Sequence, residues 1–300
     1  MKKKTYLFTL MAMALTLGSC SDNENGIGGE TSKYITVSTS IGNMTRVATD
    51  AKGGQTFEEG DEISVYAWIG APTVAPETRE RVVNNAINKL TNGAWVSTPQ
   101  MLWKNNRDKH YFIGVYPTAA ISDLSAGEYT FDANKQTESD LLVAVNKDGL
   151  SYNADEQQTV PLTFTHVMAK LVVNLTYKNQ WGGIPTVEKV AVGNAAKEAT
   201  INCLTKVVTP STTAKEDFSL PEITENTKYV SVIIPQEDVK QLTIVIGGKN
   251  FVYDNGTPFK LESGKITTVN LEVGRDEIKL GDVKITNWED GSTFSGEALN

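Results

Sequence analysis

The stretch from residue 167 to 177 carries an apolar side chain at every odd position, while Lys170, Asn174 and Thr176 occupy even ones. A period of two places successive side chains on opposite faces, which is the pattern of a β-strand and not of a helix. Similar short apolar segments recur along the chain at 62–68, 110–116, 140–145, 160–164, 187–192, 229–234, 242–246, 251–253 and 266–273. This repetition restricts the chain to folds made of many short strands.

A tight hairpin is predicted where the strand of residues 84–90 meets that of 94–98 through Asn92 and Gly93. Asn-Gly supplies the positive φ angles that a two-residue primed turn requires. A helix over 77–90 is the alternative, because five apolar residues there have near-helical spacing: Val82, Val83, Ala86, Ile87 and Leu90. We favour the strand for the second half of this segment.

Gly, Pro and Asn clusters separate the predicted strands, and no sustained amphipathic helix lies between them. This arrangement favours antiparallel β-sandwiches over a parallel sheet, so the predicted fold class is all-β. After removal of a leader, about 270 of the 300 residues remain. That length buries a substantial core and fits two domains better than one.

The first twenty residues have the pattern of a bacterial lipoprotein leader. Three lysines precede an apolar run that is too short to span a bilayer, and the run ends in Leu17-Gly18-Ser19-Cys20. We predict a signal peptide over 1–19 and lipidation of Cys20. The alternative is an ordinary signal peptide with an incidental cysteine.

A polar, glycine-rich segment over 20–32 follows, and we expect it to be a flexible tether because it has almost nothing to bury. Asp22 and Glu24 resemble the signal that sends lipoproteins to the outer face of the outer membrane. Loss of the leader lysines leaves 25 basic residues against 36 acidic ones, a net charge near −11. This balance disfavours nucleic acid and anionic lipid as partners.

Catalytic, metal-binding and disulfide chemistry all have few candidates. The two histidines, His110 and His166, lie within strand patterns, and no serine has an evident His and Asp pair, so we expect no catalytic residue, no metal and no cofactor. Cys203 is left alone once Cys20 is lipidated, and its apolar neighbours favour a buried structural thiol. The tryptophans could form a platform on which a sugar stacks, but aromatic residues in strands usually pack in the core. The five tryptophans are Trp68, Trp95, Trp103, Trp181 and Trp288.

An ordered set of motifs resembles the fimbrillin family of lipoproteins, the subunits of type V pili. The motifs are Thr45-Arg46, 57–67, the hairpin with Trp95 followed by Trp103, Tyr111-Phe112 before Val115-Tyr116-Pro117, Phe164-Thr165-His166 leading into Ala169-Lys170-Leu171, and 285–291 with Trp288. The resemblance implies two transthyretin-like seven-stranded antiparallel β-sandwich domains in tandem. We place them at 33–165 and 166–300.

The resemblance also implies that an arginine-specific protease removes the first strand together with the lipid. Here that strand is 34–41, with Tyr34, Ile35, Val37 and Ile41, and the cut falls between Arg46 and Val47. Small polar residues around Arg46 suit an exposed, cleavable loop. Cuts at Arg79 or Arg81 would remove a core strand, and an ordinary loop arginine is the alternative to any cut.

A strand from the C-terminal region of another subunit then fills the vacated groove, according to the same resemblance. The candidate donor strand is 277–286, in which Ile278 and Leu280 share one face and Val283 and Ile285 share one again after the Gly281-Asp282 break. Pairing of this segment within its own domain is the alternative.

The function that the resemblance implies is therefore structural: a non-enzymatic pilus subunit that polymerises by strand exchange and supports adhesion. Its partners would be other pilus subunits, the protease and, through lipid, the outer membrane, with the mature form in the fimbrium. The alternative is a monomeric or anchor-type surface lipoprotein that binds a glycan or protein ligand. An accessory anchor would keep its lipid, and a tip subunit would need no donor strand.

Overall fold

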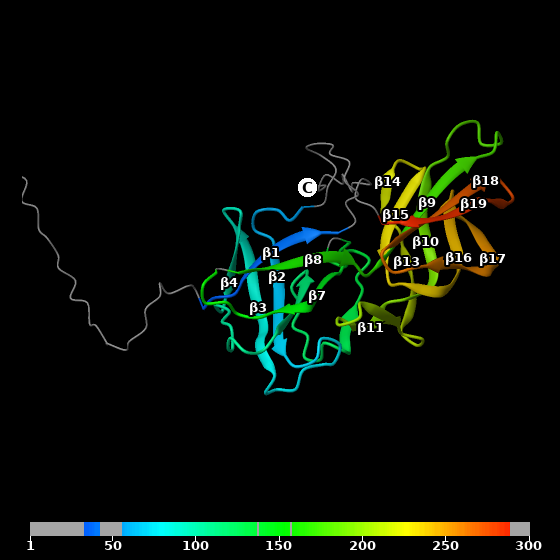
Figure 1. Cartoon of the computed structure of the whole chain (residues 1–300). Coiled ribbons are helices and arrows are strands. Elements are labelled where there is room, and N and C mark those ends of the chain that lie inside the picture. Colours follow the sequence, from blue (N-terminus) through cyan, green and yellow to red (C-terminus); the bar gives the residue numbers. More distant parts are fainter. Residues whose placement is uncertain (1–32, 43–55, 137, 157, 289–300) are drawn as a thin grey trace, which may run out of the picture. The chain divides into compact units, whose positions relative to one another are not determined.

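The structure is a computed structural model that describes residues 33–42, 56–136, 138–156 and 158–288. The chain divides into two units, 1–30 and 31–300, and every described residue belongs to the second. These residues form strands and connecting segments, which confirms the all-β prediction (Figure 1). The described residues include no helix with the length and hydrophobicity that a membrane span requires.

The N-terminal half of the described chain forms a seven-stranded sheet. Its order is β1 (Thr36–Ile41), β8 (Thr159–His166), β7 (Leu142–Leu150), β5 (His110–Tyr116), β2 (Glu62–Ile69), β3 (Arg81–Thr91) and β4 (Ala94–Thr98). The indole nitrogen of Trp95 on β4 donates to Thr39 Oγ1 on β1 at 3.0 Å. The sheet therefore curls until its two edge strands meet, and one face encloses a core.

Two further sheets, of four and five strands, bury a second core between them. The first has the order β13 (Lys215–Ser219), β10 (Val187–Ala196), β16 (Gln236–Ile246) and β17 (Lys249–Leu261), and the second β14 (Glu222–Thr224), β15 (Lys228–Ile233), β9 (Ala169–Tyr177), β18 (Lys265–Val273) and β19 (Ile278–Asn287). Apolar side chains of both sheets, such as Ile244 and Val269, belong to one buried cluster. This arrangement is a β-sandwich.

A small sheet joins segments from the two halves of the chain. Its order is β12 (Val207–Pro210), β11 (Glu198–Asn202) and β6 (Gly127–Thr130), and β6 pairs with β11 in antiparallel register. The hydrogen-bonded ladder thus links residues on either side of position 165. The domain boundary there and the transthyretin-like type of the domains stay predictions.

The predicted hairpin is confirmed, and the helical alternative over 77–90 is wrong. Asn92 and Gly93 both have positive φ angles, 52° and 74°, between β3 and β4. Near Asn85, whose φ is 59°, the ladder between β2 and β3 shifts register. An extra residue in a strand breaks the period of two, which explains why the apolar spacing of β3 looked helical.

Most strand pairs are antiparallel, but two are parallel: β1 with β8, and β9 with β18. The predicted antiparallel arrangement holds for the other pairs, and these two depart from it. A parallel pair needs a long crossover connection, and both pairs join strands far apart in the sequence. Local patterns carry no information about such partners.

Candidate functional site

The first predicted site residues lie on or next to β1, an edge strand of the seven-stranded sheet. In Figure 1, β1 (blue) runs beside β8 (green), and their register pairs Thr36 with Thr159 through to Ile41 with Phe164. The N–H of Gly42 continues this ladder by donating to the Phe164 carbonyl at 2.7 Å. The main chain of β1 is therefore paired with β8 along its whole length.

Three apolar side chains of this segment enter the core that the curled sheet encloses. Ile35 is 1% exposed, Val37 6% and Ile41 8%. They pack in one cluster with the buried side chains of β8: Val160, Leu162 and Phe164. Tyr34 differs from the other predicted residues of this strand, because it is half exposed and pairs with Leu102 through an isolated bridge.

The segment 101–103 pairs with residues 33–35, which lead into β1. The sequence did not indicate this contact. The N–H of Ile35 donates to the Met101 carbonyl at 2.9 Å, and that of Trp103 donates to the Lys33 carbonyl at 3.1 Å. Met101 and Trp103 are themselves buried. Irregular segments have no periodicity, so only the aromatic Trp103 gave a signal here.

His110 lies behind this segment and gives it a predicted pH dependence. The rings of Trp103 and His110 meet edge to face, with 5.0 Å between ring centres, and the main-chain N–H of Lys104 donates to His110 Nε2 at 3.1 Å. Burial lowers the pKa of His110 below its ordinary value of 6.5. The unfolded chain therefore takes up a proton, at pH values below about 6.5, that the folded chain resists.

The unfolding free energy is therefore not reduced by protonation of His110 well above pH 6.5. It falls as the pH is lowered from 6.5 toward the lower pKa of His110 in the folded chain. We expect each pH unit in this window to remove up to about 1.4 kcal/mol of unfolding free energy. Urea unfolding between pH 7 and 5.5 measures this loss, and His110→Gln is expected to flatten it. Equal slopes for the two proteins would contradict the assignment.

The predicted donor residues lie on β19, the edge strand of the five-stranded sheet. In Figure 1, β19 runs beside β18, its one partner in the described residues. The register pairs Ile278 with Val273 and Ile285 with Thr267, and it shifts at Gly281. The predicted break in this segment is thus a bulge. In this structure the segment pairs within its own chain.

All four predicted donor side chains lie on the core side of their sheet, because each stands opposite a buried residue of β18. Ile278 and Leu280 are half-buried, whereas Val283 is 39% exposed and Ile285 37%. The core side of β19 is therefore incompletely covered. Apolar side chains at a strand edge without full cover are suited to bury more area against another partner.

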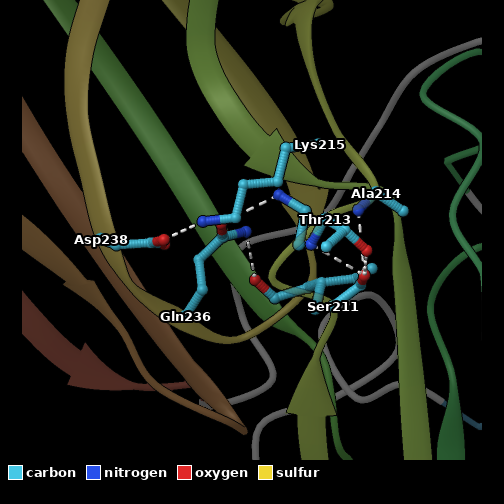
Figure 2. A network of polar contacts seen from close by, with 8 residues as sticks. Ser211, Thr213, Ala214, Lys215, Gln236 and Asp238 are labelled. Atoms are coloured by element: carbon cyan, nitrogen blue, oxygen red, sulfur yellow. Dashed lines mark hydrogen bonds and ion pairs between the residues drawn. The ribbon is translucent and has the colours of Figure 1, made fainter.

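A groove of about 610 Å³ lies among β12, β13 and β16, with a wall that includes Val207, Pro210, Ser211, Lys215, Gln236 and Ser263. Figure 2 shows its polar groups bonded to one another: Lys215 pairs with Asp238, and Ser211 Oγ accepts the Ala214 N–H at 3.0 Å. Gln236 Oε1 accepts the Ala196 N–H at 2.9 Å. These polar groups hold the wall together, so we assign the groove a structural role.

The candidates for metal binding, sugar stacking and thiol chemistry can be located in the described residues. These residues contain no group of three metal-ligating side chains. Of the five tryptophans, three are buried, and Trp95 and Trp181 are half-buried. Burial raises the pKa of the Cys203 thiol to about 12, which makes it an unreactive structural residue as predicted.

The remaining predicted site residues, Cys20, Arg46 and Val47, lie outside the described residues, as do the leader and tether. They stay predictions. The part of the site that the structure describes consists of two edge strands. β1 is paired with β8 and has its apolar side chains buried, and β19 is paired with β18 and is largely exposed.

Comparison with solved structures supports the fold. A proposed cell adhesion protein of Bacteroides uniformis superimposes with a TM-score of 0.60 and 18% identity over 78% of this chain and 94% of that one. One of Bacteroides ovatus gives a TM-score of 0.60 and 17% identity over 87% and 99%. A fimbrial protein of Bacteroides vulgatus gives 0.50 and 13% over 76% and 93%. No curated protein matches the sequence.

The sequence model of the fimbrillin-like family matches residues 45–288. This match covers most of the chain, including every described strand except β1. It agrees with the ordered motifs and with the β-sandwich fold. The chain belongs to the fimbrillin-like family.

Proposed function

We propose that this protein is a structural subunit of a cell-surface pilus that polymerises by strand exchange and supports adhesion. The precursor is lipidated at Cys20 and held in the outer membrane, and a protease cuts it after Arg46. β1 then leaves, and the β19 segment of another subunit takes its place beside β8. The family and the fimbrial and cell adhesion neighbours support the pilus role.

The observation that carries the exchange step is the position of β1. It is an edge strand with one sheet neighbour, and it nevertheless supplies Ile35, Val37 and Ile41 to an enclosed core. Removing it would uncover Val160, Leu162 and Phe164 on β8, which an apolar strand from outside could bury again. When a strand is added to a sheet edge, main-chain hydrogen bonds hold it, and pockets for its alternate side chains select its sequence.

A disulfide lock on β19 tests this proposal. Thr268 and Lys284 stand opposite each other in the antiparallel β18–β19 register. Both side chains lie on the face away from the core, at half-buried and exposed positions. Opposed Cα atoms about 4.5 to 5.5 Å apart suit a disulfide, so Thr268→Cys with Lys284→Cys fixes β19 on its own sheet. Cys203 is buried and does not compete for this bond.

We expect the oxidised double variant to stay monomeric after cleavage at Arg46 and to form filaments once the disulfide is reduced. Filament length by electron microscopy and N-terminal sequencing measure the two steps. Lys284→Cys alone is the matched control and is expected to assemble under both conditions. Assembly of the locked protein at the normal rate would show that β19 is not the exchanged strand.

A further inference from the structure

Trp288, the residue directly after β19, lies in a built aromatic site. Its side chain is 4% exposed, and its ring stacks face to face on His166, with 4.0 Å between ring centres and 5° between planes. The main-chain N–H of Trp288 donates to the Gly264 carbonyl at 3.0 Å. Both the backbone and the side chain of this residue are therefore held.

The groups that hold the Trp288 ring come from elements other than β19. His166 ends β8, and its Nδ1 lies 2.9 Å from Asp140 Oδ1. The Lys170 ammonium on β9 lies 5.3 Å from the centre of the indole ring, and Lys170 is only 3% exposed. A cation over an indole face is attracted by the ring quadrupole, more strongly where water is excluded. The site thus stays with the body of the protein when β19 moves.

The part of β19 that precedes Trp288 contributes no buried side chain. Residues 281–287 are all exposed, and their described ladder partner is β18. Terminal strand segments with few buried contacts open with low free energy. The last buried contact of the strand is therefore the one at Trp288, just beyond its C-terminal end.

We infer that Trp288 is an intramolecular latch that keeps β19 on β18 in the monomer, and that withdrawal of its ring from His166 and Lys170 is the step that frees the strand. The inference rests on the proposed function for the use of the freed strand. It assigns to this contact the control of when the strand becomes available.

Hydrogen–deuterium exchange on the full chain before cleavage tests the latch without any polymerisation. In Trp288→Ala, we expect the amides of 279–287 to exchange at least tenfold faster than in the unchanged protein, while those of β9 remain protected. Trp288→Phe keeps a ring and is expected to show a smaller increase. Trp103→Ala, which removes an equally large buried side chain from the core that the seven-stranded sheet encloses, is the control and is expected to leave 279–287 unchanged.

Unchanged exchange of 279–287 in Trp288→Ala, with the remaining protein folded, would overturn the latch. Assembly is then measured separately after cleavage, where the freed strand is expected to shorten the lag before filaments appear. Faster exchange without any filament from either protein would retain the latch and reject the proposed function. Normal filaments together with unchanged exchange would reject the latch and retain the proposed function.

Discussion

A chain that begins at Val47 is expected to unfold at a much lower urea concentration than a chain that begins at Ser32. The shorter chain lacks Ile35, Val37 and Ile41, which are almost fully buried. At about 1.5 to 3 kcal/mol for each side chain, their loss removes roughly 4 to 9 kcal/mol of unfolding free energy. A typical domain has about 5 to 15 kcal/mol in total, so the seven-stranded sheet is expected to be barely stable alone.

Urea titration followed by tryptophan fluorescence measures this difference, because Trp95 and Trp103 lie beside the β1 site. A synthetic peptide of residues 277–288 is expected to restore part of the lost stability, and a scrambled peptide of the same composition is the control. Equal unfolding midpoints for the two chains would show that β1 contributes little to the core. Rescue by the scrambled peptide would show that the groove does not select the sequence of its occupant.

The strand content followed from the sequence because its causes are local. The strand predicted from the alternation at 167–177 and the Asn92-Gly93 turn each depend on a few neighbouring residues, and the structure has both a strand, β9, and the turn. The break at Gly281 is likewise visible in the sequence and appears as a bulge in β19. Where an inserted residue disturbed the alternation, as at Asn85 in β3, the same reasoning left helix and strand undecided.

The partners of each strand did not follow from the sequence because they depend on contacts between distant segments. Nothing near Thr36 indicates that β1 runs parallel to β8 more than a hundred residues later. The stacking of Trp288 on His166 is a contact of the same kind. Both histidines and Trp288 stood out as residues, but their environments arise only from the folded chain.

The second large effect is expected at Phe164, which packs in the core cluster against which the apolar side chains of β1 lie. Its side chain is fully buried, opposite Ile41 in the β1–β8 register, and its ring meets Phe57 edge to face with 5.1 Å between centres. Phe164→Ala is expected to lower the unfolding free energy by about 3 to 5 kcal/mol, because it removes the ring and leaves a cavity. Weaker binding of any strand in the groove, whether β1 or a donor, should accompany this loss.

The packing of Phe164 against β5 allows a sharper test with Gly114. A methyl group at Gly114 would lie 2.5 Å from Cζ of Phe164, which is too close for two carbon atoms. Gly114→Ala alone is therefore expected to cost about 1 to 3 kcal/mol through overpacking. In the Phe164→Ala background the clash with the ring is absent, so the double variant should be more stable than the sum of the single changes predicts, by about 1 kcal/mol or more.

Urea unfolding of the four proteins gives this coupling energy directly. Phe218 on β13 provides the control, because it is a buried aromatic residue of another sheet and is absent from the close contacts of Gly114. Gly114→Ala and Phe218→Ala are expected to be additive within about 0.5 kcal/mol. Additive losses for Gly114 and Phe164 would mean that the ring does not occupy the space above Gly114. In that case Phe164 of β8 would not pack closely against β5, and it would not form the apolar surface that a strand in the position of β1 contacts.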